Sequence, residues 1–181
     1  MLTVVTINGS PTKPSRTGIL LDAVAEAVAG ELTCTRETIA LADVAPEFMC
    51  GLTRPDITAK GEELLRMTEC ADLLIVGTPV YRATYTGVLK HFFDLVDRDA
   101  MRERKAVLCA TGGSPLHGLM LEHQLRPLMG FFSMQTITTG LFGLTDDFAD
   151  GRVVSPDLNK RIDRVANEVV AAFAPARALA S

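Results

Sequence analysis

The chain has 181 residues, of which 48% are hydrophobic and 22% are charged, and its formal net charge is −4. This length suits one domain with a sizeable core, and the composition carries no signature of disorder. A negative net charge argues against nucleic-acid binding, which needs a basic surface. No apolar run approaches the roughly 18 residues that a membrane-spanning helix requires. We therefore expect a globular protein that binds neither nucleic acid nor membrane.

The N-terminal residues and the cysteines indicate a cytoplasmic protein. Residues 1–7 have no basic segment before their apolar run, so we interpret them as a strand and not as a signal peptide. The cysteines lie far apart and form no CxxC pair; they are Cys34, Cys50, Cys70 and Cys109. This spacing predicts free thiols, with neither a metal site nor a redox motif.

In the first half of the chain, short β-branched runs alternate with helical patterns. The predicted elements are a strand at 3–7, a helix from about Thr17 with Gly30 just past its end, an edge strand at 34–39, a loop at 40–58, a helix at 59–69 and a strand at 73–77. The first and last of these are continuous apolar runs, which are typical of central strands covered on both faces. The loop prediction depends on Pro46 and Pro55.

The second half continues the alternation. It predicts a helix at 86–96, a strand at 106–110, a long helix at 115–131, a strand at 135–139 and a last helix that begins at Ser155-Pro156-Asp157. Five strand–helix units predict an α/β fold, a three-layer, doubly wound, five-stranded parallel sheet of order 2-1-3-4-5. We expect residues 1–174 to form this single domain and residues 175–181 to be a frayed tail.

In such a sheet, ligands bind beyond the carboxyl ends of the strands, near the point where the strand order reverses. Three loops leave predicted strands at this place: 8–17, 78–87 and 111–114. The first precedes a helix and carries several hydroxyls with Lys13 and Arg16, which suit a phosphate group. It matches neither GxGxxG nor GxxxxGK[ST], so neither a dinucleotide Rossmann site nor a nucleoside triphosphate site is expected.

The other two loops suit a planar ring system. The loop at 78–87 carries both tyrosines of the chain, Tyr81 and Tyr85. The glycines of the loop at 111–114 let the backbone approach a flat ligand, and its N–H groups can stabilise negative charge on a reduced ring. Each loop alone also has a purely structural interpretation, because strand-to-helix turns favour glycine, serine and proline, and tyrosines often cap a core.

The predicted helix at 115–131 is apolar around most of its surface, so we expect it to be buried on both sides, with one side in a subunit interface. Pro127 cannot donate a hydrogen bond to the carbonyl of His123, which favours a kink or a π-bulge. His123 has two interpretations, an interface histidine or a functional one. His117 lies close enough to the glycine loop to touch a ligand.

Taken together and in order, these segments resemble the NADPH-dependent FMN reductases, particularly those that partner two-component alkanesulfonate monooxygenases. The matching segments are Gly9-Ser10-Pro11 with Ser15-Arg16, TPVYRATYTGVLKHFFDLVD from Thr78, and ATGGSPLHGLMLEHQLRPL from Ala110. The resemblance extends from the first to the fifth predicted strand. It implies a flavodoxin-like fold, and hydride transfer from the nicotinamide C4 of NADPH or NADH to N5 of FMN.

The resemblance also implies which residues bind FMN. They are Ser10, Ser15, Arg16 and Thr17 at the phosphate, Pro79, Val80, Tyr81, Arg82 and Tyr85 along the ring, and Thr111, Gly112 and Gly113 at its pyrimidine edge, with His117 nearby. We expect no catalytic acid or base, because the protein needs only to stack nicotinamide on flavin and to supply donors near flavin N1.

Some members of this family carry an inserted residue that turns the fourth helix into a π-helix at a tetramer interface, and His123 lies at that place. The alkanesulfonate-system reductases resemble this chain there except that they carry a tyrosine. The departure leaves open whether FMN is an exchanging substrate or a prosthetic group, and it favours a methanesulfonate-type monooxygenase as partner. A homodimer or a homotetramer is expected, with His123 and Pro127 at its interface.

Two other functions on the same fold stay open. The first is a quinone or azo reductase, in which FMN remains bound and a second organic substrate enters. The second is an electron-transfer flavodoxin, a class that is usually more acidic and covers the flavin ring with aromatic residues, whereas this chain has no tryptophan. Retention of FMN through turnover would favour the first of these.

Overall fold

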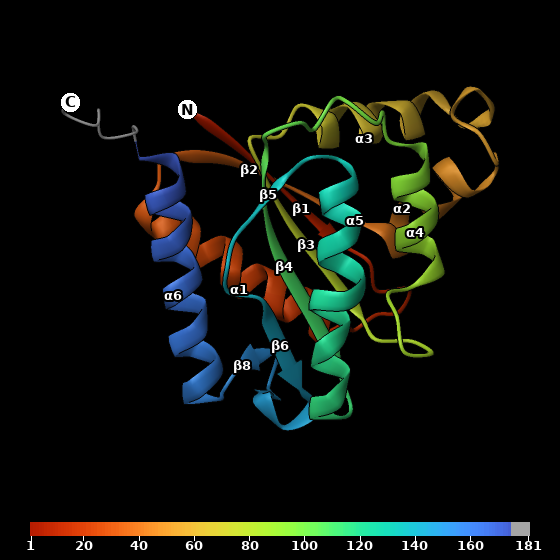
Figure 1. The fold of residues 1–181 in the computed structure, drawn as a ribbon. Coiled ribbons are helices and arrows are strands. Elements are labelled where there is room, and N and C mark those ends of the chain that lie inside the picture. The colour runs from red at the N-terminus through yellow and green to blue at the C-terminus, as the bar shows by residue number, and fades with distance from the viewer. Residues whose placement is uncertain (175–181) are drawn as a thin grey trace, which may run out of the picture.

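A computed structural model describes residues 1–174. It consists of a parallel β-sheet between two layers of helices, as Figure 1 shows. The strands of this sheet are β1 (Leu2–Asn8), β2 (Cys34–Ala40), β3 (Leu73–Pro79), β4 (Lys105–Gly112), β5 (Gln135–Thr136) and β6 (Leu141–Leu144). Their order is β2-β1-β3-β4-β5, and β6 also pairs with β4. The predicted fold class and the predicted strand order are therefore confirmed.

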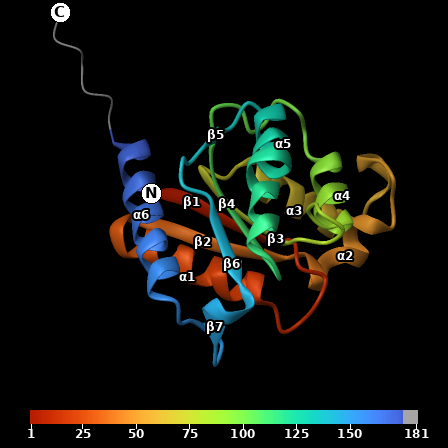
Figure 2. The ribbon, with the colours of Figure 1, turned by 60° about the horizontal axis from the view of Figure 1, so that its bottom comes forward.

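The helices cover the two faces of the sheet unequally (Figure 2). One face carries α1 (Arg16–Glu31) and α6 (Pro156–Phe173); the other carries α2 (Leu41–Met49), α3 (Ala59–Glu69), α4 (Gly87–Leu95) and α5 (Arg126–Phe131). A small antiparallel ribbon, β7 (Phe148–Ala149) with β8 (Arg152–Val153), follows β6. No helix within residues 1–174 is both long and apolar enough to cross a membrane.

Strand β3 is the central element of the core. Its side chains alternate between the two faces, so that Leu74 and Val76 join the apolar cluster under α4 and α5, while Leu73 and Ile75 join the cluster under α1 and α6. All four are essentially inaccessible to solvent. This double coverage explains why the strand is a continuous apolar run in the sequence.

The prediction of a loop at residues 40–58 was wrong, because residues 41–49 form helix α2. Leu41 and Phe48 are fully buried on one face of this helix, two turns apart. Pro46 lies inside the helix on its exposed side, where it removes one backbone hydrogen bond. Burial of the apolar stripe offsets that loss. A 3₁₀ turn at Arg54–Asp56 follows, with Pro55 in its first turn.

Two smaller differences concern element ends. Gly30 lies inside the last turn of α1, which ends at Glu31, and the N–H of Leu32 closes the helix on the carbonyl of Val28. The predicted fifth strand at 135–139 is short and is followed by a separate strand, β6. Between the two, the backbone carbonyls accept hydrogen bonds from side chains instead of extending the ladder: Arg126 donates to Ile137 and Thr138, and Arg161 donates to Gly140.

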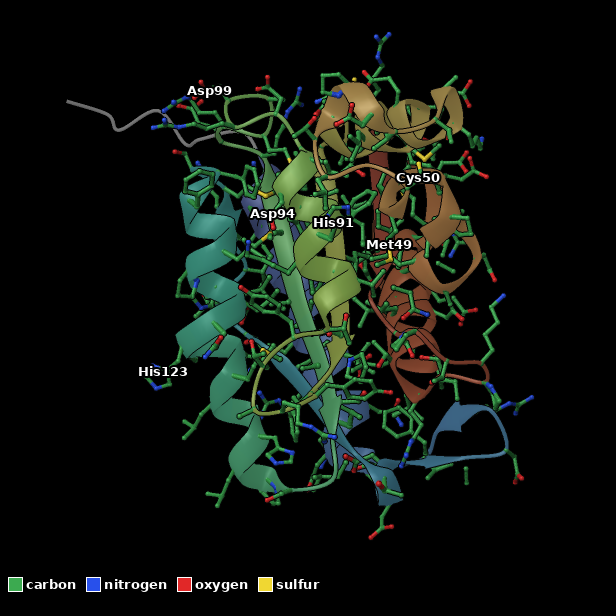
Figure 3. The ribbon with its side chains drawn as sticks, turned by 90° about the vertical axis from the view of Figure 1, so that its right-hand side faces the viewer. Met49, Cys50, His91, Asp94, Asp99 and His123 are labelled. Carbon is green, nitrogen blue, oxygen red and sulfur yellow. The ribbon has the colours of Figure 1, made fainter. Side chains whose placement is uncertain are left out.

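The long helical segment after β4 changes its winding twice. It begins as a 3₁₀ turn at Pro115–Gly118, becomes a π-helix at Leu121–Leu125 and ends as α5. The N–H of Arg126 donates to the carbonyl of Leu121, five residues earlier, which is the π-helical spacing. His123 lies in this π-helix, and Figure 3 shows its side chain pointing away from the body of the protein. Residues 175–181, the predicted tail, lie outside the described residues.

Candidate functional site

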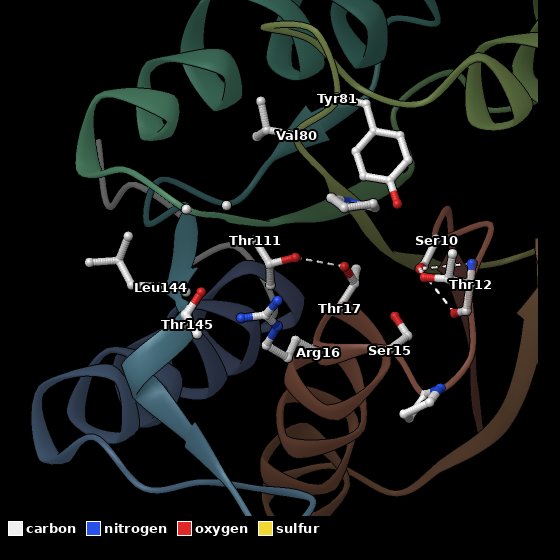
Figure 4. A pocket seen from close by; sticks show the side chains of 15 residues that line it. Ser10, Thr12, Ser15, Arg16, Thr17, Val80, Tyr81, Thr111, Leu144 and Thr145 are labelled. Atoms are coloured by element: carbon white, nitrogen blue, oxygen red, sulfur yellow. Dashed lines mark hydrogen bonds between the residues drawn. The ribbon is translucent and has the colours of Figure 1, made fainter.

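The register of the sheet brings the ends of three central strands together. Asn8 at the end of β1 pairs with Gly77 in β3, and Pro79 at the end of β3 pairs with Thr111 in β4. A cavity of about 230 Å³ lies beyond these ends (Figure 4). It is lined by Ser10, Thr12, Pro14, Ser15, Arg16, Thr17, Pro79, Val80, Tyr81, Thr111, Gly112, Gly113, Gly143, Leu144 and Thr145.

The β1–α1 loop presents the N-terminus of a 16-residue helix to this cavity. Ser15 is the N-cap, and its hydroxyl accepts a hydrogen bond from the N–H of Gly18 at 3.1 Å. The first turn of α1 contains no acidic residue, so nothing neutralises the positive end of the helix dipole. Arg16 follows the cap directly and is exposed at the rim. This end of the cavity therefore suits an anion.

The β3–α4 loop is folded into a tight hairpin. The main chains of Tyr81 and Thr84 exchange two hydrogen bonds, and the residues between them, Arg82 and Ala83, both have positive φ angles of 52° and 68°. Residues other than glycine rarely adopt such backbone angles, so contacts with the rest of the protein must stabilise this turn. Thr86 provides one such contact, because its hydroxyl donates to the carbonyl of Gly9 at 2.7 Å. The hairpin leaves Tyr81 at the cavity, 44% exposed.

The β4 loop joins the first loop by a buried hydrogen bond. The hydroxyls of Thr17 and Thr111 lie 2.7 Å apart, and both residues are almost inaccessible to solvent. Gly112 is closely packed: a Cβ there would lie 2.9 Å from the ring of Phe142 and 3.0 Å from His117 Nδ1, so a larger residue would have to displace these side chains. The backbone of Gly112 and Gly113 therefore forms the cavity wall directly.

Most of the residues expected at the flavin line this single cavity, but three do not. The exposed side chain of Arg82 lies on the turn, and Tyr85 packs against the core under α4. His117 packs against Gly112 and lines a separate, mainly apolar cavity together with His123, Leu116, Leu119 and others. Lys13, another cation of the first loop, forms an ion pair with Asp43 of α2.

Sequence reasoning missed the contribution of β6. Gly143, Leu144 and Thr145 line the cavity, and Figure 4 shows Leu144 and Thr145 across it from Tyr81. Because the fifth strand was predicted to end at 139, these residues had no assigned place. The signal was present in the apolar run at 141–144, which ends in a polar turn as the other central strands do.

The side chains that line the cavity carry a single positive charge. Among the described residues that line it, Arg16 is the one charged side chain, and the lining includes no carboxylate and no histidine. The hydroxyls of Ser10, Thr12, Ser15, Thr17, Thr111 and Thr145 supply most of the remaining polarity. Such a lining favours a bound anion.

Comparisons with known proteins agree with this geometry. Residues 2–149 match the family described as NADPH-dependent FMN reductase. The NADH-dependent FMN reductase SfnF of Pseudomonas fluorescens is 41% identical over 172 residues, covering 95% of this chain and 92% of the relative. An FMN reductase (NADPH) of Pseudomonas aeruginosa is 39% identical over 170 residues, covering 94% and 91%.

A solved structure is similar to this chain in both fold and sequence. An oxidoreductase from Corynebacterium diphtheriae superimposes with a TM-score of 0.85 at 35% identity, covering 95% of this chain and 96% of the other. The family match extends over most of the chain and includes the three loops and β6 that form the cavity. The chain therefore belongs to the NADPH-dependent FMN reductase family.

Proposed function

We propose that this protein is an NAD(P)H:FMN oxidoreductase that supplies reduced FMN to a flavin-dependent monooxygenase of the sulfonate type. The observation that carries the proposal is the single cavity at the ends of β1, β3 and β4, which has an anion site at one end and backbone walls at the other. The relatives at about 40% identity are named as reductases of FMN, some with NADH and some with NADPH. We therefore propose that either NADH or NADPH is the reductant.

The first loop fits the phosphate of FMN. The N-terminus of α1 supplies unpaired N–H groups and a positive dipole end, and Arg16 adds a full charge that no carboxylate of the lining opposes. Ser10 is 4% exposed, and its hydroxyl, which donates to the carbonyl of Thr12 at 3.2 Å, shapes the loop. The hydroxyls of Thr12 and Thr17 line the same end of the cavity.

The other two loops fit a planar ring. Pro79, Val80 and Tyr81 line one part of the cavity, and Gly112 and Gly113, which have no side chains, line another. At Gly113 no other atom lies within 4 Å of where a Cβ would be, so the main chain can approach a ligand closely. The N–H groups of this loop are donors that can stabilise negative charge.

When bound, FMN supplies the redox chemistry, since its ring accepts a hydride from reduced nicotinamide. The protein itself binds the flavin and the nucleotide and orients them. The hydrogen bond between Thr17 and Thr111 keeps the phosphate end and the ring end at a fixed separation, and Thr86 fixes the hairpin to β1. Hydride transfer between stacked rings needs no acid or base of the protein, so we assign no proton-transfer residue.

The experiment that tests this function is a flavin titration. Flavin-stripped protein is mixed with NADH or NADPH, and nucleotide oxidation is followed as free FMN is raised from trace to large excess. We expect the rate to saturate far above the enzyme concentration, and reduced FMN to pass through a dialysis membrane to a separate acceptor. Saturation at one FMN per subunit, with a requirement for an added quinone, would instead indicate a quinone reductase.

The monooxygenase partner is tested separately. Reduced FMN produced by this protein should support oxygenation of a short alkanesulfonate, methanesulfonate above all, by a flavin-dependent monooxygenase that receives no other reductant. Failure of that coupling, with normal flavin reduction, would remove the partner from the proposal and leave the reductase activity in place.

A further inference from the structure

A second cavity, of about 560 Å³, adjoins the first one at the open edge of the sheet. Within the described residues β6 pairs only with β4, so its other edge faces the gap between the 115–122 segment and helix α6. We call this cavity the edge groove. It is lined by Pro115, Gly118, Leu121, Glu122, Thr138, Thr139, Gly140, Phe142, Leu144, Asp147, Arg161 and Arg164.

The edge groove and the flavin cavity share their walls. Leu144 lines both, and the β4 loop borders the flavin cavity at Gly113 and the groove at Pro115. The partition between them is thin. Phe142 lines the groove, and its ring fits against the backbone of Gly112, where a Cβ would lie only 2.9 Å away. An elongated ligand whose one end lies over the flavin can therefore continue into the groove.

The groove combines an apolar wall with two arginines and two carboxylates. Pro115, Leu121 and Phe142 provide flat apolar surface. Glu122 is held by two hydrogen bonds from Arg126, 2.6 and 2.8 Å long, and these keep the pKa of its carboxyl below the usual range. Asp147 accepts a hydrogen bond from the N–H of Leu144 at 2.7 Å. The charge of Glu122 is thus balanced by Arg126, which lies outside the lining, and Arg161 and Arg164 face Asp147 as the other carboxylate of the groove.

The two arginines differ in their partners. Arg161 donates to the carbonyl of Gly140 at 2.6 Å, and so helps to hold the break between β5 and β6. Arg164, one turn further along α6, has no hydrogen bond or ion pair with any residue in 1–174. Arg164 is exposed at the border of the groove, and a guanidinium without a carboxylate partner among residues 1–174 is suited to pairing with phosphate.

We propose that the edge groove binds the adenosine phosphate half of the nicotinamide cofactor, with Arg164 as its phosphate contact. The inference rests on the proposed function, because that function requires a dinucleotide whose nicotinamide end lies at the flavin. The apolar wall suits a purine, Asp147 suits a ribose hydroxyl, and Arg164 suits either the pyrophosphate or a 2′-phosphate. The groove is thereby the part of the protein that determines nucleotide affinity.

The test measures binding without turnover. Calorimetric titrations of ADP and of adenosine 2′,5′-bisphosphate are carried out on protein saturated with FMN, so that the flavin phosphate site is filled. The variant Arg164→Ala should weaken binding about tenfold, because one charged hydrogen bond is lost. A loss confined to the bisphosphate places the 2′-phosphate at Arg164, and an equal loss for both ligands places the 5′-phosphates there.

Lys160→Ala is the matched control. It removes a cation from the same helix, and Lys160 lies outside the groove, in an exposed pair with Asp157. We expect Lys160→Ala to bind ADP and adenosine 2′,5′-bisphosphate as tightly as the unaltered protein does. In steady-state kinetics, Arg164→Ala should raise KM for NADPH or NADH by the same factor and leave kcat and KM for FMN unchanged.

Two results would overturn the inference: no binding of either nucleotide to the FMN-loaded protein, or equal binding by Arg164→Ala and the unaltered protein. Both are independent of the proposed function. A protein that binds the nucleotides through Arg164 but does not reduce FMN would disprove the reductase activity and keep the subsite. A protein that reduces FMN, but binds the nucleotides equally well with and without Arg164, would keep the reductase activity and disprove the subsite.

Discussion

At the scale of single residues, the two cations of the first loop have different surroundings, although they are only three positions apart. Arg16 lines the cavity at the ends of β1, β3 and β4, beside the helix N-terminus, whereas Lys13 is paired with Asp43 on α2. In the sequence both cations suited a phosphate group, and the resemblance assigned only Arg16 to it. In the structure only Arg16 lines the cavity. Lys13 is paired with a carboxylate of α2, a helix that the sequence did not predict.

This difference can be measured with FMN and riboflavin, which differ in the phosphate. Arg16→Ala should raise KM for FMN about tenfold, the effect of losing one charged hydrogen bond, and leave KM for riboflavin unchanged. Lys13→Ala should change neither constant appreciably, because exposed ion pairs contribute little. Equal effects of Arg16→Ala on both flavins would show that Arg16 does not contact the phosphate.

At the scale of elements, the sequence predicted what local pattern determines and missed what packing determines. The strands at β1, β3 and β4 are apolar runs bounded by turn residues, and their predicted positions agree with the structure to within two residues. Helix α2 was missed because Pro46 argues against a helix locally, and burial of Leu41 and Phe48 decides otherwise. Strand β6 was missed because it is short and depends on side chains such as Arg161 for its start.

The connection between α2 and α3 also depends on side chains, and it should be sensitive to acid. Arg54 donates to Glu62 and to Glu69, and Arg66 donates to Glu62 as well. These bonds lower the pKa of Glu62 from 4.5 to about 2. A carboxyl whose pKa is lower in the folded state adds stability above its unfolded pKa, and that stability is lost as the pH falls through the folded value. The relevant window is therefore between pH 4.5 and pH 2.

The prediction compares Glu62→Gln with Glu63→Gln across this window. Glu62→Gln should unfold at lower urea concentration than the unaltered protein at pH 7, and the two should converge as the pH approaches 2. Glu63 is more exposed and pairs only with Lys60 among the described residues, so Glu63→Gln should keep the pH dependence of the unaltered protein. Urea midpoints at several pH values supply the measurement. A constant difference between Glu62→Gln and the unaltered protein would contradict the role given to Arg54 and Arg66.

At the scale of the whole molecule, the position of the candidate site follows from topology, while its composition follows only partly from sequence. The strand order 2-1-3-4-5 brings together the loops after β1, β3 and β4, and these loops were predicted to share a crevice. Side-chain direction was not predictable in the same way. Tyr85 and His117 follow the right strands, but one packs inward and the other packs on Gly112.

The expected association of subunits is also a property of the whole molecule. Leu116, Leu119 and Phe131 are 78%, 59% and 61% exposed along the segment from 115 to 131, an unusual amount of apolar surface for one helical segment. His123 of the π-helix points outward from the same segment. We expect another copy of the chain to cover this surface, in keeping with the predicted homodimer or homotetramer.

A charge introduced at Leu119 should break such an assembly, because an unpaired carboxylate is costly to bury. We expect the unaltered protein to sediment as a dimer or tetramer at micromolar concentration and Leu119→Glu to sediment as a smaller species. Leu52→Glu is the matched control: Leu52 is 88% exposed and lies in the connection between α2 and α3, away from this segment, so its assembly should be unchanged. A monomeric unaltered protein would refute the expectation. Because Leu119 lines the apolar cavity next to Ala83 of the hairpin, dissociation should also reduce the affinity for FMN by loosening the wall that carries Tyr81.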